Sequence, residues 1–420
     1  MFILRKLLKL LLLPVLALTL TACVGDEPNN IAYVTAMGID KTNESYLYTI
    51  QFAQPTKISG GSGEEGGSIG NIVENVTVEA PTLYSAINIA DTIISKDLSL
   101  SHAKVLVVSE EIARDGIAWV NDIITRNNDI RPDIYISVSE NADEYLEEVK
   151  PSIELNPVKY YQLTYENKNG SAIPQNNARD FYSAYIAGSR DCLLPLAGIA
   201  EGADEAPKEE SEQKSIENAR QTEAKQNRGG FDNGTRNYYA GETGKRIQNK
   251  SEVLGSAVFV GDRYVGKLGS TETELHNILM NQFTTMNISF YTGEESPLTL
   301  KVFEKAAPEY KINKDEKNVE IFPELKCDLL SAPEGYRYSH SIEDAEEEVA
   351  AMVNSAAEQL IHKVYREMKS DVLGIRGRLR SGFLTLDDYE SYISSFDPAE
   401  WSFTVKSRVN IRRTGMTYYR

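Results

Sequence analysis

The polar stretch at residues 202–250 is the feature that most constrains how this chain of 420 residues can fold. It includes the run ADEAPKEESEQKSIENARQTEAKQNRGG and has hardly any large apolar residue before Phe231. Such a segment cannot bury enough apolar surface to offset the entropy lost when it becomes ordered. We therefore expect residues 202–250 to be a disordered acidic and polar linker or insertion between two folded parts, in which an isolated exposed helix can form.

The part before this linker alternates between strand and helix patterns. Three β-rich runs open it, and a wholly apolar run later in it is typical of a strand that is buried on both faces. The expected strands are 31–40, 46–54, 71–80, 103–110 and 133–139, and the expected helices are 81–95, 111–126 and 142–149. This order predicts an N-terminal α/β domain over residues 31–150.

Residues 151–201 are less regular and predict a helix that leads into a strand ended by Pro195. They form either a second domain or an extension of the first. Residues 251–420 predict a C-terminal α/β domain that begins with a hairpin around Gly261-Asp262. The fold class is therefore α+β or mixed α/β, with several domains built on mixed sheets and flanking helices.

A long helix is expected over residues 342–369 of the C-terminal domain. Its apolar residues recur every three or four positions, as on the buried face of a helix. We expect this stripe to pack into a core rather than to bind a partner. Its members are Ile342, Ala345, Val349, Met352, Ala356, Leu360, Val364 and Met368.

Residues 1–22 have the order of a secretory signal peptide. Arg5, Lys6 and Lys9 precede an uncharged apolar run from Leu10 to Leu20, and small residues follow. The apolar run is shorter than the roughly 20 residues that a membrane-spanning helix needs. We therefore interpret residues 1–22 as a signal peptide rather than a transmembrane segment.

Leu20-Thr21-Ala22-Cys23 resembles the bacterial lipobox, in which the cysteine receives a diacylglyceryl thioether and becomes the first residue after cleavage. The alternative is an ordinary signal peptide with an incidental cysteine. Removal of residues 1–22 would change the formal net charge from −18 to −21, and such a chain is repelled by anionic lipid and by nucleic acid. We therefore expect lipid attachment at Cys23, a tether at residues 23–30, and no nucleic-acid partner.

Motifs of catalysis and cofactor binding have little support. Residues 61–66 match G-x-G-x-x-G, but more glycine and a strand follow instead of a helix, and two glutamates there would repel phosphate. Residues 66–70 match G-x-S-x-G by spacing, but a strand pattern rather than a helix follows them, so they form no nucleophile elbow, and the chain has no H-E-x-x-H motif. Its four histidines and three cysteines form no cluster, so we expect no catalytic residue, no metal and no cofactor. Cys192 and Cys327 are either two buried thiols, which we favour, or a disulfide.

Several separated segments resemble the C-subunit lipoproteins of spore germinant receptors, the Ger(x)C family. They occur in the family's order and cover nearly all of the chain outside the linker. They are the lipobox at Cys23, Met37-Gly38-Ile39-Asp40, residues 95–117 with His102 and Lys104, Arg126–Arg131, residues 255–274, residues 370–379 and Trp401-Ser402-Phe403. The chain departs from the family pattern in three places: no tryptophan follows Cys23, the glycine before the strand histidine is absent, and Arg376 stands where a second glycine is usual.

The resemblance implies a non-catalytic receptor subunit with a fold of three mixed α/β domains. Such proteins are held by lipid on the outer face of the spore inner membrane, beside integral-membrane A and B subunits, and act in nutrient-triggered germination. Only Cys23 carries over as a functional residue. Residues 95–104 are a candidate partner contact through His102 and Lys104, although both can simply cap and flank a buried strand.

Two other functions are compatible with a secreted, anchored α/β protein. A solute-binding lipoprotein of an uptake system would share the anchor, but its two lobes should look alike, and the halves here are dissimilar. An envelope hydrolase would need a catalytic constellation that the sequence lacks.

Overall fold

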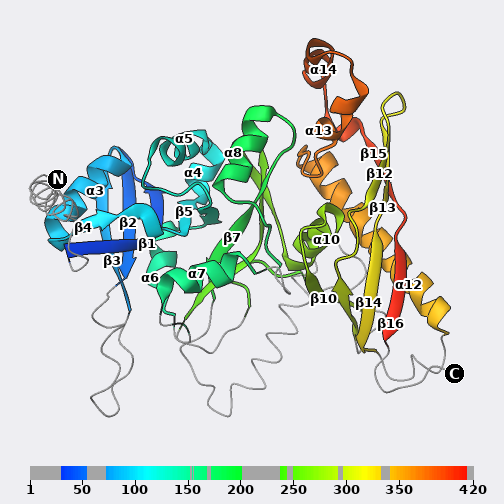
Figure 1. Cartoon of the computed structure of the whole chain (residues 1–420), viewed down its shortest axis with the longest axis horizontal. Coiled ribbons are helices and arrows are strands. Elements are labelled where there is room, and N and C mark those ends of the chain that lie inside the picture. Colours follow the sequence, from blue (N-terminus) through cyan, green and yellow to red (C-terminus); the bar gives the residue numbers. More distant parts are fainter. Residues whose placement is uncertain are drawn as a thin grey trace, which may run out of the picture.

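The computed structural model describes residues 30–53, 72–151, 154, 156–167, 172–200, 237–243, 249–291, 297–332 and 341–413. They form two parts that lie side by side along the longest axis of the molecule (Figure 1). Cys23 and residues 61–66 lie outside the described residues. The mixed α/β fold class is confirmed, since both parts combine sheets with helices.

A sheet of nine strands forms the first part. Its strand order is β3-β2-β1-β5-β6-β7-β8-β9, and β4 adds to β1. The strands β1, β5, β6 and β7 pair in parallel, and the strands on either side of them are antiparallel. Their bounds are β1 Ile31–Lys41, β2 Tyr46–Ala53, β3 Val73–Ala80, β4 Asp97–Ser99, β5 Val105–Ser109, β6 Tyr135–Ser139, β7 Leu193–Ile199, β8 Ser251–Val260 and β9 Arg263–Leu268.

Helices cover both faces of this sheet. Alternate residues of β5 face opposite cores: Leu106 and Val108 pack in one, and Val105 and Val107 pack in the other. This confirms the prediction that the apolar run at 103–110 is a strand buried on both faces. In Figure 1, α4 and α5 lie above the strands, and α6 and α7 lie below them. The helix bounds are α3 Leu83–Ile94, α4 Glu110–Asp115, α5 Ala118–Arg126, α6 Ala142–Glu147, α7 Pro157–Tyr165 and α8 Ala178–Ala187.

The helix expected over 111–126 is two helices, α4 and α5. The chain breaks at Gly116, whose φ of +115° lies outside the region that other residues readily adopt. A Cβ at this position would lie 2.7 Å from Oδ2 of Asp262. The break therefore results from the tip of the β8–β9 hairpin, which packs against this turn.

The second part combines two smaller sheets with helices. One sheet has the order β10-β11-β14-β16, and the other has the order β12-β13-β15. The bounds are α10 Ser270–Met280, β10 Thr285–Tyr291, β11 Pro297–Phe303, β12 Glu309–Asn313, β13 Asn318–Phe322, β14 Glu324–Ser331, α12 Ile342–His362, α13 Ile375–Leu379, α14 Leu386–Ile393, β15 Ser402–Val405 and β16 Arg408–Arg413.

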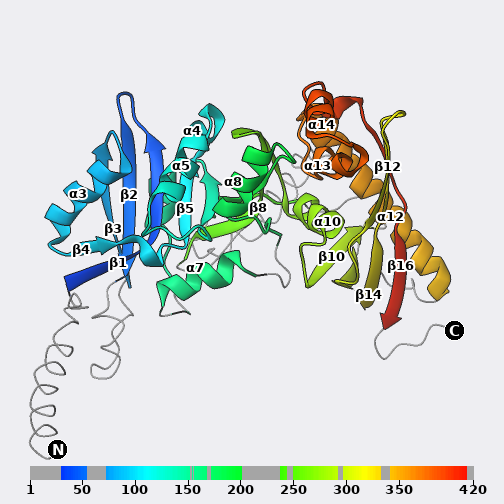
Figure 2. The same cartoon turned by 45° about the horizontal axis from the view of Figure 1, so that its top comes forward.

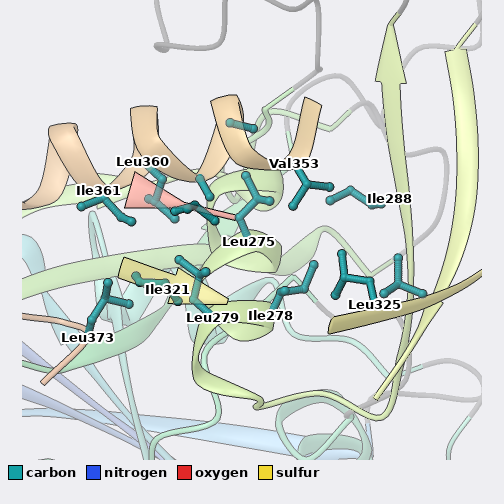
Figure 3. Packing of buried hydrophobic residues seen from close by; sticks show 14 of the residues in the cluster. Leu275, Ile278, Leu279, Ile288, Ile321, Leu325, Val353, Leu360, Ile361 and Leu373 are labelled. Atoms are coloured by element: carbon teal, nitrogen blue, oxygen red, sulfur yellow. The ribbon is translucent and has the colours of Figure 1, made fainter. Parts of the chain in front are cut away.

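The long helix α12 packs against strands of both sheets and against α10. Its first turn is closed by a capping box of Ser341 and Asp344. Figure 3 shows Val353, Leu360 and Ile361 of α12 facing Leu275 and Leu279 of α10. The α-helix ends at His362 and continues as a π-helical turn over Lys363–Glu367, so it is shorter than the expected range 342–369. The predicted stripe is buried at five of its eight positions; Met352 and Met368 are partly buried and Ile342 is exposed.

The two parts share the strand β8. Phe259 and Ala257 of β8 belong to the core of the first part, whereas Val258 belongs to the core of the second. The structure therefore places residues 251–268 in the first sheet, although the sequence groups them with the C-terminal domain. The hairpin at Gly261-Asp262 is confirmed.

The segment 237–243 of the expected linker packs against the folded chain. Ala240 donates its backbone N–H to Leu254 O at 3.1 Å, and Ser270 donates its own to Tyr238 O at 2.7 Å. The linker prediction is therefore wrong for residues 237–243. The rest of 202–250, apart from residues 249–250, lies outside the described residues.

Cys192 and Cys327 are free buried thiols. They lie in different cores, which confirms the favoured prediction over a disulfide. Burial raises the pKa of Cys192 to about 11 and that of Cys327 to about 12, so neither is a reactive thiolate near neutral pH.

Candidate functional site

A buried set of polar and charged side chains joins the two parts of the molecule. We call it the polar junction, and it consists of Asp191, Tyr365, Ser370, Asp371 and Arg376. Asp191 precedes β7 of the first sheet, and the other four belong to the second part. Asp371 is fully buried and Asp191 is 4% exposed, so each carboxylate needs partners within the protein.

Hydrogen bonds between backbone and side chain tie the segments together. Asp371 donates its backbone N–H to Oδ2 of Asp191 at 2.7 Å, and Asp191 donates its backbone N–H to Asp371 O at 3.1 Å. The Ser370 hydroxyl donates to Phe259 O of β8 at 2.7 Å. Ser370 and Asp371 therefore attach the second part to β8 and to Asp191, which precedes β7.

Arg376 lies between the two carboxylates. Its Nη2 is 2.8 Å from Oδ1 of Asp191, and its Nε donates to Oδ2 of Asp371 at 3.2 Å. Asp371 also accepts the Ile375 N–H at 2.8 Å and the Tyr365 hydroxyl. One guanidinium thus bridges residues that are 180 positions apart in the chain.

The pKa values of Asp371 and Arg376 reflect both their burial and their pairing within the polar junction. Burial raises the pKa of Asp371 to about 6, although Tyr365, Arg376 and Ile375 lower it in part through hydrogen bonds and charge. Burial disfavours the charge of Arg376, but Asp191 and Asp371 outweigh this effect and raise its pKa. Because the oxygens and the guanidinium are engaged with one another, this arrangement is suited to holding segments in place rather than to turning over a substrate.

The tip of the β8–β9 hairpin connects the junction to the helices of the first part. Gly261 donates its N–H to Oδ1 of Asp191 at 3.0 Å. Asp262 accepts the N–H groups of Ile117 and Ala118, at 3.0 Å on its backbone oxygen and 3.2 Å on its carboxylate. The hairpin therefore provides hydrogen-bond partners for the beginning of α5.

A second buried ion pair lies within the second part. Glu272 of α10 is fully buried, accepts the Gly269 N–H at 2.8 Å, and lies 2.6 Å from Nζ of Lys363. It connects the beginning of α10 to the π-helical turn that follows α12.

A cleft of about 940 Å³ lies at the carboxyl ends of the parallel strands β5 and β6. Ligands of open α/β sheets commonly bind at this edge. Its lining is acidic, with two lysines: Glu110, Glu140, Glu144, Glu147, Glu148, Glu242, Lys250 and Lys267, beside Tyr239 and apolar residues of β7. Nearby Asp40 caps α6 by accepting the N–H groups of Ala142 and Asp143 at 2.8 and 2.9 Å. The strand ending at Met37-Gly38-Ile39-Asp40 therefore positions the helix that forms one wall.

The candidate contact residues His102 and Lys104 lie directly before the buried strand β5, as expected if they only cap and flank it. His102 is exposed, contacts Ser101 at 3.0 Å, and its ring lies edge-on to Tyr33 with centroids 4.8 Å apart. The backbone of Lys104 donates to Thr35 O and accepts from Tyr135 N, both at 2.9 Å, at the start of β5. Their role in partner binding stays a prediction.

No metal cluster of three or more His, Cys, Asp or Glu side chains occurs among the residues that the structure describes. Within the same residues, every helix is too short or too polar to cross a bilayer.

Two family models match this chain in sequence order. Residues 25–199 match the model described as the spore germination protein N-terminal domain. Residues 254–415 match the model described as spore germination B3/GerAC like, C-terminal. The chain belongs to the Ger(x)C family. The resemblance found in the sequence is thereby confirmed, and family membership supports a role in spore germination.

Two curated relatives and one solved structure are similar to parts of this chain. The putative spore germination protein YfkR of Bacillus subtilis (strain 168) is 35% identical over 130 residues, which are 30% of this chain and 34% of that protein. Spore germination protein KC of the same organism is 29% identical over 132 residues, 30% of this chain and 32% of that protein. The matches span about a third of each curated relative. The crystal structure of the GerBC protein aligns with 90% of this chain and 96% of that chain at 14% identity and a TM-score of 0.48.

The polar junction connects the two family-matched regions, since Asp191 belongs to the first and Ser370, Asp371 and Arg376 belong to the second. Sequence reasoning singled out residues 370–379 but not Asp191, and it noted Arg376 only as a departure from a glycine. The available signal was the charged Arg190-Asp191 pair directly before an apolar strand. A charge in that position needs a partner, but nothing in the sequence identifies which one.

Proposed function

We propose that this Ger(x)C protein is the lipid-anchored C subunit of a spore germinant receptor. It acts by contact, without catalysis, beside integral-membrane A and B subunits in nutrient-triggered germination. The observation that carries the proposal is the ordered match of both germination-protein domains, over residues 25–199 and 254–415.

The anchor in this proposal is a thioether at Cys23. Two acyl chains suffice for stable membrane attachment, because each buried CH₂ contributes ~0.8 kcal/mol. The first strand begins at Ile31, so residues 23–30 are left as a short tether. The proposed location is the outer face of the spore inner membrane, where an acidic chain needs such an anchor to stay at an anionic surface.

A role by contact, without catalysis, is supported by the pairing of buried carboxylates with cations inside the protein. Asp191 and Asp371 bind Arg376, and Glu272 binds Lys363. These charges stabilise the junction and the second core, and the free thiols are buried with raised pKa values.

Intact-mass analysis of the protein from its native membrane tests the anchor. The wild type should begin at residue 23 and carry the mass of a diacylglyceryl group, with or without a further acyl chain. Cys23→Ala should remain unprocessed and unlipidated, whereas the control Cys192→Ala should be modified like the wild type. A wild-type protein that is processed but carries an unmodified Cys23 contradicts the anchor.

Co-purification from dormant spores tests the receptor. The protein, extracted in mild detergent, should bring down an A-type and a B-type membrane subunit. Extraction of a lipidated protein without either subunit would leave the anchor intact and refute the receptor assignment.

The cleft at the ends of β5 and β6 favours a second candidate, a solute-binding lipoprotein of an uptake system. A thermal-shift series with amino acids and sugars distinguishes the two, because a ligand that binds the folded state raises its melting temperature. Saturable stabilisation by one of these solutes would support the second candidate.

A further inference from the structure

A groove of about 520 Å³ lies in the second part of the molecule, between β12 and the turn after α13. These elements lie together at the end where α14 projects (Figures 1 and 2). The groove, which we call the basic groove, is lined by Tyr310, Ile312, Lys314, Arg378, Leu379, Ser381 and Gly382.

Both cations of the basic groove are held by aromatic rings. The guanidinium carbon of Arg378 is 3.7 Å from the centroid of Tyr310, and its Nε donates to Leu373 O at 3.2 Å. Nζ of Lys314 is 4.8 Å from the centroid of Phe383. Cation–π contacts of this kind orient a cation and leave it able to bind an anion.

These two cations differ from their neighbours in having no carboxylate partner among the described ion pairs. Lys317 pairs with Glu400, and Lys406 pairs with Glu320. The lining of the groove contains no Asp or Glu, although acidic residues outnumber basic ones by 62 to 44 in the chain. The groove is therefore complementary to an anionic ligand.

The surroundings favour an extended peptide as that ligand. β12 is an edge strand of its three-stranded sheet, so its outer side can add a strand. Tyr310 and Ile312 line the groove from one face of β12, and Leu379 adds apolar surface. Beyond Gly382, the side chain of Leu384 is fully exposed and Leu386 is 51% exposed, so this segment presents apolar surface to solvent.

We propose that the basic groove binds an extended segment of a partner protein in which acidic residues alternate with apolar ones. The segment lies along β12 with its carboxylates on the groove side, where they bind Lys314 and Arg378, and its apolar side chains lie on the other side of the added strand. A phospholipid headgroup would provide a negative charge, but it cannot pair with a strand edge. This surface is separate from the proposed anchor and receptor role, and either can fail without the other.

Fluorescence anisotropy tests the proposal with the full chain carrying Cys23→Ala, so that no acyl chain contributes. The Lys314→Glu variant of the same chain keeps the same N-terminal leader and controls for lipid binding by that leader. The probe is a fluorescein-labelled octapeptide of alternating Glu and Leu, and the comparison probe is the same peptide with Lys in place of Glu. Vesicles of phosphatidylglycerol, with phosphatidylcholine as reference, form the lipid arm. We expect saturable binding of the Glu–Leu peptide alone.

Charge reversal provides the matched control. Lys314→Glu should weaken binding of the Glu–Leu peptide at least about tenfold, since attraction becomes repulsion. Lys311→Glu makes the same change on the opposite face of β12, where Nζ lies over Phe322, and should leave the affinity within about twofold. Circular dichroism melts confirm that both variants fold.

Three outcomes would overturn the proposal. The first is absence of Glu–Leu peptide binding to the folded chain. The second is an equal loss of binding in both charge-reversal variants, which would indicate nonspecific attraction. The third is binding of phosphatidylglycerol vesicles that Lys314→Glu abolishes while peptide binding is unaffected, which would assign the groove to lipid.

Discussion

Replacing Arg376 by Met should destabilise the whole chain through the polar junction. The change removes the 2.8 Å contact with Asp191 and the 3.2 Å hydrogen bond to Asp371. Removing one partner of a buried ion pair typically costs ~3–5 kcal/mol, because a charge is left without compensation. We expect the lower end, about 3 kcal/mol, because Asp371 keeps the hydrogen bond from Tyr365 and Asp191 keeps that from Gly261.

The loss should depend on pH in a defined direction. In the folded chain, burial already raises the pKa of Asp371 to about 6, and removal of the guanidinium raises it further. The folded variant then binds this proton more tightly than the unfolded chain does, and stability supplied by such a proton is lost as the pH rises through the folded pKa. Arg376→Met should therefore be most destabilising near pH 8 and recover part of its stability as the pH falls to 5.

Urea unfolding at pH 5, 6.5 and 8 measures both effects. Trp119 lies in the first part and Trp401 in the second, so single-tryptophan versions report on each part separately. Arg380→Met, a change of an exposed arginine on the same segment, should alter the unfolding free energy by less than about 0.5 kcal/mol. If Arg376→Met were no more destabilising than Arg380→Met at pH 8, or if its effect grew at pH 5, the reasoning about a buried, proton-sensitive network would be refuted.

Two further predictions concern buried groups. Burial lowers the pKa of His276 to about 4, so the unfolded chain binds a proton at this residue more readily than the folded chain does. The free energy of unfolding should therefore fall by up to about 3 kcal/mol as the pH falls from 6.5 to 4. His276→Gln should flatten this part of the pH profile measured by urea unfolding. Gly255→Ala should lower the melting temperature measured by calorimetry, because φ is +83° and a Cβ would lie 2.5 Å from Leu268 O, whereas Gly382→Ala, with nothing within 4 Å, should change it little.

Sequence periodicity was sufficient to predict those elements whose structure depends only on residues close in the sequence. The apolar run at 103–110 predicted a strand between two cores, and the turn at Gly261-Asp262 predicted its hairpin. The single helix predicted over 111–126 was wrong, because the break at Gly116 depends on Asp262 from a distant hairpin. Local patterns cannot report such a contact.

The polar junction could be predicted only in part, for a related reason. Residues 370–379 were recognisable as a family segment, but their partner Asp191 is 180 positions away from Asp371. The sequence analysis treated Arg376 as a departure from a glycine. In the structure, its guanidinium balances two buried carboxylates, so the arginine is compatible with the site only because Asp191 and Asp371 are both present.

The position of β8 determines how a contact on one part can affect the other. Phe259 packs in the first core and Val258 in the second, and the Phe259 carbonyl accepts the Ser370 hydroxyl. Rotating the second part against the first would therefore require β8 to leave one core and the charged side chains of the polar junction to separate. Together these two changes cost far more free energy than thermal motion supplies. The described parts should move as one body. A partner that binds the basic groove would then reposition the first sheet by rigid displacement, whereas Arg376→Met should loosen that connection.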